Sequence, residues 1–173
     1  EDALRRRVEA LSRFDHPSFA RVRAVEWLGG QDLALVSTHT TGRRLSEVLG
    51  EARGPQLATE LIRQLTPALA ALHQQGPDVA HGLLTPERIV ITPEGRLIIV
   101  EHVLSTALDS LRLSAERLRV EFGIAVPPAE DPPKFDARSD VRQLGYLALS
   151  LMLGRSIGRG SSPESLLRLL NQD

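Results

Sequence analysis

The sequence feature that most constrains the fold is a block at residues 81–101. It begins with a loop-like stretch, residues 81–88, whose polar residues are His81, Thr85, Glu87 and Arg88, and it continues into two short apolar runs, residues 89–91 and 97–100. Pro93, Glu94 and Gly95 lie between the two runs, and Pro and Gly at this spacing are typical of a turn. We therefore predict a β-hairpin that directly follows an irregular polar loop.

The block resembles the catalytic loop, hairpin and metal-binding motif of eukaryotic-type protein kinases. In that family the loop reads His-Arg-Asp-Leu-Lys-Pro-Glu-Asn, and the hairpin after it leads to Asp-Phe-Gly. The family's spacing places Glu101 at the metal-binding Asp. The matching loop positions are His81, Leu84, Pro86 and Glu87, and the differing ones are Gly82, Leu83, Thr85 and Arg88, in place of Arg, Asp, Lys and Asn.

The differing positions carry the chemistry of phosphotransfer in the family. The loop Asp accepts the proton of the substrate hydroxyl, and Leu83 has no group that can do so. Thr85 is uncharged where a Lys would stabilise the phosphoryl group. Arg88 brings a cation to a position where Asn and Asp oxygens would hold Mg²⁺. The resemblance therefore implies a degenerate member of the protein-kinase-like superfamily, a pseudokinase that is not an enzyme and has no catalytic residues.

Glu101 is the one candidate metal ligand in this block. Its carboxylate could reach a metal ion, but it lacks the Asn partner that the family uses. The alternatives are a solvated carboxylate or a pair with Arg88, which would fill the metal position with a protein cation. We expect no bound metal and predict no cofactor.

The lysine content is consistent with this prediction. Kinases position the ATP phosphates with a Lys of the small lobe that pairs with a Glu of helix C. Lys134 is the only lysine of the chain, and no Gly-rich phosphate loop precedes the block. The resemblance therefore does not predict ordinary Mg-ATP binding, and nucleotide-binding residues stay unassigned.

The N-terminal part resembles a piece of a kinase small lobe. Residues 1–14 have the apolar spacing of an amphipathic helix, similar to helix C, and the family's ion-pairing Glu falls on Arg7, which we expect to point into the cleft. Two strand-like runs at 22–28 and 33–38 flank a Gly29-Gly30 turn. Residues 37–42 correspond to the hinge that holds adenine in the family.

The rest of the chain resembles a mainly helical large lobe. Leucines recur through residues 56–75, and apolar residues at steps of three and four predict a helix over 104–121. Residues 127–130 resemble the family's Ala-Pro-Glu, and residues 135–145 resemble the start of helix F. A last helix is expected from Ser162-Pro163-Glu164.

These segments predict an α+β fold of protein-kinase-like type. Residues 1–42 would form a partial small lobe, made of helix C plus strands, and the hinge. Residues 43–173 would form the helical large lobe of the same domain. We expect the chain to be a part of a longer protein.

Five residues have structural rather than catalytic roles in this interpretation. The resemblance implies that His81 packs in the core and that Asp140 accepts hydrogen bonds from the loop backbone. Leu11, Val22 and His102 would continue from His81 as a column of side chains between the lobes. His102 replaces an apolar Phe of the family, and we interpret it as a buried histidine rather than a metal ligand.

Composition excludes several classes of partner. The formal net charge of −1 gives no reason to expect nucleic acid. There is no cysteine, so no disulfide is possible, and no apolar run approaches the ~20 residues of a membrane span. We predict a cytoplasmic protein without membrane insertion, and the excess of Arg over Lys favours a bacterial source.

Three functions remain open from the sequence. The first is a scaffold or allosteric regulator that binds a protein partner or other domains of its own chain. The second is a divergent nucleotide-binding enzyme with an atypical phosphotransfer or related activity. The third is a purely structural domain in a larger assembly.

Overall fold

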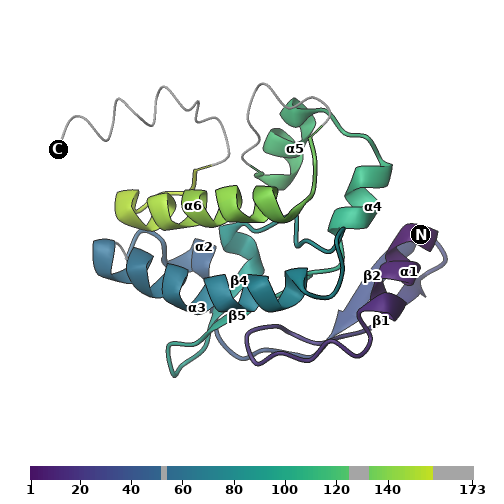
Figure 1. The fold of residues 1–173 in the computed structure, drawn as a ribbon, viewed down its shortest axis with the longest axis horizontal. Helices are drawn as coiled ribbons and strands as arrows, with labels where there is room; N and C mark the ends of the chain where they lie inside the picture. The colour runs from purple at the N-terminus through teal and green to yellow at the C-terminus, as the bar shows by residue number, and fades with distance from the viewer. Residues whose placement is uncertain (52–53, 125–132, 158–173) are drawn as a thin grey trace.

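Two long helices, α3 (Pro55–His73) and α6 (Ala137–Leu153), lie side by side in the computed structural model (Figure 1). The model describes residues 1–51, 54–124 and 133–157. In α3 most of the leucines that predicted a helix lie on its buried face. Leu61, Leu65 and Leu72 are almost fully buried there, because helical spacing places them on one side.

A three-stranded sheet lies beside these helices, in the order β3-β4-β5. Strands β4 (Ile89–Ile91) and β5 (Leu97–Ile99) are the predicted hairpin, with Ile89 opposite Ile99 in antiparallel register. Strand β3 (Arg43–Arg44) pairs with β4 and was not predicted, because two arginines carry no strand pattern. Strand β4 begins directly after Arg88, so the sheet holds the C-terminal end of the polar loop.

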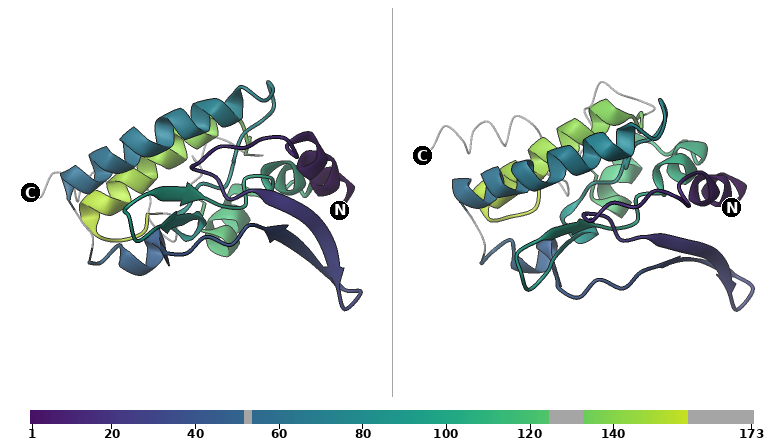
Figure 2. Two further views of the ribbon diagram at one scale, coloured as in Figure 1. Left: turned by 90° about the horizontal axis from the view of Figure 1, so that it is seen from below. Right: turned by 60° about the horizontal axis from the view of Figure 1, so that its bottom comes forward.

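The N-terminal part forms a unit of one helix and one hairpin. Helix α1 (Asp2–Ala10) contacts strand β1 (Val22–Leu28), which pairs with β2 (Asp32–Ser37) in a two-stranded antiparallel sheet. Figure 2 shows this hairpin projecting away from α3 and α6. The hairpin at 22–38 is thus confirmed.

The remaining elements are short. They are α2 (Leu45–Val48), a 3-10 turn (Pro86–Arg88), α4 (Ser105–Ser110) and α5 (Ala115–Phe122). Together with the sheets and long helices they give the mixed α+β content that the sequence predicted.

One large apolar core joins the N-terminal unit to the helices. It includes Leu4 and Leu11 from the first segment, Val22 from β1, Leu65 from α3 and Leu147 from α6. Leu11 and Val22, two residues of the predicted column, are therefore buried in the same cluster as the long helices.

Two predicted helices differ from the structure. The first ends at Ala10 rather than near residue 14. Past this point Phe14 turns toward the ring of Phe19, with the ring centroids 5.2 Å apart. The helix over 104–121 is divided into α4 and α5, because Arg112 has φ of +47° and the side chain of Ser114 caps α5 by accepting a hydrogen bond from the backbone N–H of Arg117.

Some predictions fall outside the described residues. These are the Ala-Pro-Glu-like segment at 127–130 and the last helix from Ser162. None of the helices in the part of the chain that the structure describes is long and apolar enough to cross a membrane.

Candidate functional site

Asp140 holds the backbone of the polar loop. It lies in the first turn of α6 and is fully buried. Its Oδ1 accepts a hydrogen bond from the Gly82 N–H at 2.6 Å, and its Oδ2 accepts one from the His81 N–H at 2.8 Å. His73 Nε2 on α3 donates to the same Oδ2 at 2.8 Å. Three donors therefore satisfy a carboxylate that would otherwise be costly to bury.

Gln143 is a second anchor of the loop, and the sequence analysis missed it. Its Oε1 accepts from the Leu84 N–H at 2.6 Å, and its Nε2 donates to the Gly82 carbonyl at 2.8 Å. Gln143 follows Asp140 by three residues, so both side chains leave the same face of α6. That spacing is the sequence signal that could have identified it.

Gly82 is required by its backbone conformation and its neighbours. Its φ is +72°, in the left-handed region that favours glycine. A Cβ at this position would also lie 2.7 Å from the Cβ of Ser105 and 2.9 Å from Cδ1 of Phe135. No longer side chain fits there without movement of the residues that cover the loop.

His81 is fully buried and makes two hydrogen bonds through its ring. Nε2 donates to the Val100 carbonyl at 3.0 Å, and Nδ1 accepts from the Leu83 N–H at 3.2 Å. Burial lowers the pKa of His81, and the Asp140 carboxylate opposes this effect only in part. The neutral ring therefore ties the loop to the end of β5.

His102 is another residue of the predicted column. Its ring meets Phe14 and Phe19 edge-on, with centroids 5.7 Å and 5.0 Å away. Burial lowers its pKa to about 3, and its Nδ1 is a buried atom with no hydrogen-bond partner among the described residues. The histidine thus occupies an aromatic environment that would also suit a phenylalanine.

Leu83 does not face the cleft in this structure. Its side chain is fully buried against Leu108, Leu118 and Ile124, which come from α4, from α5 and from the residues that follow α5. The position that holds the proton-accepting Asp in the resembled family is thus part of a second apolar cluster. This cluster attaches the segment after Glu101 to the loop.

Arg88 and Glu101 bind each other. Arg88 Nε lies 3.0 Å from Glu101 Oε2, and Arg88 Nη1 donates to Thr85 Oγ1 at 3.1 Å. Glu101 has φ of +62°, an uncommon conformation for a non-glycine residue. The three altered positions that the sequence assigned to phosphate and metal chemistry therefore form one small network.

A divalent cation does not fit this network. The guanidinium of Arg88 contacts Glu101, the only carboxylate of the network. Thr85 Oγ1 already accepts a hydrogen bond from the same guanidinium. Within the ranges that the structure describes, no group of three or more His, Asp or Glu residues could hold a metal ion.

A cleft of about 780 Å³ borders the network at Glu101. Residues 35–40 line one side of it, and Val90, Val100 and Glu101 are among the residues that line the rest. The predicted hinge and the one candidate metal ligand therefore share a cleft. The lining also includes Arg44 and Glu47, whose carboxylate accepts from the Arg44 N–H at 3.2 Å.

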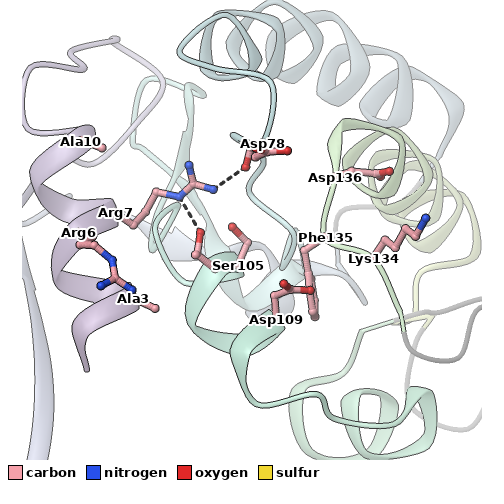
Figure 3. Close-up of a pocket in the computed structure, with 11 residues that line it drawn as sticks. Ala3, Arg6, Arg7, Ala10, Asp78, Ser105, Asp109, Lys134, Phe135 and Asp136 are labelled. Atoms are coloured by element: carbon pink, nitrogen blue, oxygen red, sulfur yellow. Dashed lines mark hydrogen bonds between the residues drawn. The ribbon is translucent and has the colours of Figure 1, made fainter.

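Arg7 faces a different pocket from the one the sequence predicted. It does not line the cleft beside Glu101. Its guanidinium instead points between α1 and α4, as Figure 3 shows, and bonds Thr106 and the carbonyl of Asp78. The prediction that Arg7 points into the cleft is wrong, because α4 lies close enough to receive it.

Comparisons with known proteins agree with this geometry. No protein-family model matches the chain. A calcium/calmodulin-dependent protein kinase of Metarhizium anisopliae is 25% identical over 167 residues, which cover 93% of this chain and 43% of that protein. The serine/threonine-protein kinase PrkC of Bacillus subtilis is 25% identical over 169 residues, covering 94% of this chain and 25% of PrkC.

Two further matches come from a longer kinase and from a crystal structure. The mouse eIF-2-alpha kinase GCN2 is 26% identical over 155 residues, covering 86% of this chain and 9% of its own length. The structure of Rad53 residues 1–466 in complex with AMP-PNP superposes with a TM-score of 0.64 at 20% identity, covering 99% of this chain and 43% of Rad53. The chain is protein-kinase-like in sequence and in fold.

This finding confirms the predicted superfamily and the α+β protein-kinase-like fold. It also corrects one prediction. The sequence analysis concluded that the chain is not an enzyme, whereas the relatives of this kinase-like chain are named protein kinases and point to an enzyme. The chain spans less than half the length of the curated relatives it matches.

Proposed function

We propose that this kinase-like chain acts in regulation, as a scaffold or allosteric regulator that binds a protein partner or other domains of its own protein. The single observation that carries the proposal is the Arg88–Glu101 pair. Side chains at the positions that hold metal and phosphate in the resembled kinases bind one another here. A regulatory role needs a stable kinase-like surface, and it does not require Arg88 or Glu101 to bind a metal ion or a phosphate.

The segment after Glu101 supplies the surface for such a role. Helix α4 reaches α1 through the Arg7–Thr106 hydrogen bond, and Leu108 and Leu118 attach the segment to the loop. A change in the position of α1 would therefore be transmitted to α4 and α5. A purely structural domain, the alternative, needs no such coupled segment.

Hydrogen exchange on the full-length protein tests this proposal. Protein with and without its flanking domains, or with and without a partner isolated by pull-down, is compared at the amides of residues 101–124. A regulator is expected to change protection in this segment. Unchanged protection, with binding retained, would contradict regulation through this segment and would favour the structural alternative.

Nucleotide-dependent phosphotransfer is the second candidate, and three observations favour it. The relatives are named protein kinases, and the Rad53 structure contains AMP-PNP. The cleft beside residues 35–40 has room for a ligand. Transfer of labelled phosphate from ATP by the full-length protein, to itself or to a general protein substrate, would establish this function.

The remaining parts of the proposal concern organisation and location. Residues 1–42 act as the partial small lobe with the hinge, and residues 43–173 as the large-lobe segment. The absence of cysteine and the balanced charge support a cytoplasmic, nucleic-acid-independent protein, and the preference for Arg over Lys supports a bacterial source.

A further inference from the structure

Helix α6 carries an exposed apolar stripe. Val141 is 64% exposed and Met152 is 49% exposed, and Gly145 is exposed between them. Leu149, which is half-buried, belongs to the same stripe, because steps of four, four and three residues keep side chains on one side of a helix. We call these four residues the α6 outer face. Apolar residues with this spacing ordinarily mark the side of a helix that packs against another element.

The opposite side of α6 is already occupied. Leu147 and Leu151 are buried in the large core with residues of α3, which runs alongside α6 (Figure 1). Asp140 and Gln143 hold the polar loop. Among the described residues, no core cluster includes a member of the α6 outer face. In this part of the chain neither the core nor the loop therefore covers the outer face.

Gly145 lowers the middle of the α6 outer face. Glycine is unfavourable in the interior of a helix, and a Cβ at this position would meet no described atom within 4 Å. The packing of the described residues therefore gives no reason for a glycine here. The distance between two packed helices depends on the side chains at their contact, so a glycine at this point lets a second helix approach closely.

The charges at the two ends of the α6 outer face are positive. Arg138 lies three residues before Val141 and is exposed, and Arg155 is exposed directly after Gly154, the residue that ends α6. The only carboxylate within α6 is Asp140, which is fully buried in its hydrogen bonds to the loop. An apolar stripe with a cation at each end favours a partner that has carboxylates beside an apolar stripe of its own.

The neighbouring carboxylates have partners of their own. Asp136 accepts a hydrogen bond from the Ser139 N–H at 2.9 Å, at a helix N-terminus where the helix dipole offsets its charge. Glu60, the single carboxylate of α3, accepts hydrogen bonds from Arg63 Nε and Gln64 Nε2, both at 2.7 Å. Residues 134–155 contain four basic and two acidic residues, which gives this segment a net charge of +2.

We propose that the α6 outer face binds an amphipathic helix of a partner protein, whose apolar stripe is flanked by Asp or Glu residues. The partner's apolar side chains pack along the outer face, and its backbone passes closest at Gly145. Its carboxylates meet Arg138 and Arg155. Asp140 and Gln143 of the same helix anchor the polar loop, so a partner bound here acts on that anchor. The proposal rests on the regulatory function proposed above and names the surface and the chemistry of its partner.

Charge separates this partner from other possible occupants. In a pair of identical outer faces, Arg138 and Arg155 of one copy would meet the same two cations of the other copy, and like charges repel. Residues 158–173 of the chain contain two arginines and two carboxylates, so their charges balance. Neither a second copy nor this segment supplies the excess of negative charge that the outer face favours.

Fluorescence anisotropy of a labelled peptide tests the proposal on the full-length protein. The peptide is designed as a helix with leucines along one side and glutamates on both flanks, and a matched peptide has lysines in place of the glutamates. Binding is measured for the unmodified protein and for Val141→Glu, Gly145→Leu and Arg138→Glu, which all change exposed residues. Val120→Glu is the matched control, at a valine of α5 that is 67% exposed.

We expect the glutamate peptide to bind and the lysine peptide to bind about tenfold more weakly. Val141→Glu should weaken binding of the glutamate peptide about tenfold, because it places a charge in the apolar stripe, and Val120→Glu should leave binding unchanged. Gly145→Leu should weaken binding to a similar extent, because its side chain keeps the partner helix at a distance. Arg138→Glu should reduce the preference for the glutamate peptide several-fold.

Several results would overturn the proposal. They are no binding of the glutamate peptide, equal binding of the two peptides, an equal loss in Val141→Glu and Val120→Glu, and binding of phosphatidylserine vesicles without binding of the peptide. Peptide binding only after the four leucines of residues 166–170 are changed to Gln would show that the chain's own residues cover the outer face. A dimer in sedimentation velocity that Val141→Glu dissociates would show that a second copy does so.

Failure of this proposal can be distinguished from failure of the regulatory function. Peptide binding that Val141→Glu abolishes, combined with unchanged hydrogen exchange at residues 101–124, would contradict regulation alone. A partner-dependent change in exchange at 101–124 that persists in Val141→Glu would contradict the α6 outer face alone.

Discussion

The backbone of the polar loop and the side chains of Arg88 and Glu101 are held in different ways. The loop backbone is held by buried groups, Asp140 and Gln143, which together bind four backbone atoms of residues 81–84. Beside it, the partly exposed side chains of Arg88 and Glu101 bind each other. The loop backbone thus depends on buried partners from α6, whereas Arg88 and Glu101 depend on each other.

The difference has a physical cause. Removing a buried acceptor leaves several backbone N–H groups without partners, and each such group costs free energy. Exchanging a partly exposed side chain costs little, because water replaces what is lost. The stability of the loop therefore does not depend on the identity of the cleft side chains, and the following predictions test this contrast.

Asp140→Ala should have the largest effect. It leaves the His81 and Gly82 N–H groups and the His73 ring without their acceptor, and we expect a loss of about 3–5 kcal/mol in the free energy of unfolding. Urea denaturation measures this loss, with the exposed Asp109→Ala as control. A loss of less than about 1 kcal/mol in Asp140→Ala would contradict the anchoring role.

Leu83→Ala should come next. Leu83 is fully buried against Leu108, Leu118 and Ile124, so its truncation opens a cavity and should cost about 2–4 kcal/mol. Leu111→Ala, at a leucine that is 61% exposed, should cost less than about 0.5 kcal/mol. Similar losses in the two variants would contradict the burial of Leu83.

His102→Phe should change the dependence of stability on pH. The pKa of His102 is lowered from 6.5 to about 3 in the folded protein, so below pH 6.5 the unfolded chain binds a proton that the folded chain does not. Stability conferred by the neutral ring is therefore lost as the pH falls from 6.5 toward 3, by about 1.4 kcal/mol per unit.

Urea denaturation at pH 7.5 and 4.5 measures this difference. The advantage of His102→Phe over the unmodified protein should grow by about 2–3 kcal/mol between the two values. His81 is present in both proteins, so its own contribution cancels. His39→Phe, at an exposed site, is the matched control. An advantage that does not change with pH would refute the burial of a neutral His102.

The Arg88–Glu101 pair should have the smallest effect on stability. The two side chains are 15% and 36% exposed, and a double-mutant cycle with Arg88→Gln and Glu101→Gln should give a coupling of about 0.5–1 kcal/mol. The more exposed pair Arg117–Glu121, with side chains 60% and 44% exposed, should give less. The order of these couplings would be reversed if the contact between Arg88 and Glu101 did not persist in solution.

Much of the fold was predictable because local patterns and packing agree. Most leucines of α3 lie on its buried face, and the Gly-Gly turn joins two strands that pair in antiparallel register. The predicted helix over residues 104–121 was wrong because the chain turns there without Gly or Pro. Arg112 adopts a left-handed conformation and divides the predicted helix, and nothing in its side chain predicts this.

The site was predictable in its positions but not in its contacts. The spacing from the loop identified Glu101, and the exchange to Arg88 suggested a partner for it. By contrast, Leu83 was identified only as an altered position, since sequence spacing does not give the direction of a loop side chain. Arg7 was assigned to the wrong pocket for the same reason, because the position of α4 depends on tertiary packing.

The central proposal is that Arg88 pairs with Glu101 at the position where the resembled kinases hold a metal ion. A thermal-shift titration of the full-length protein with ATP, with Mg²⁺, Mn²⁺ or EDTA, tests it most directly, together with the variant Arg88→Asn. A nucleotide at a hundredfold excess over its dissociation constant stabilises a protein by about 2.7 kcal/mol. We predict that Mg²⁺ and Mn²⁺ add nothing to any shift by ATP in the unmodified protein, and that a metal-dependent shift occurs only in Arg88→Asn. A clear metal-dependent shift in the unmodified protein would contradict the claim.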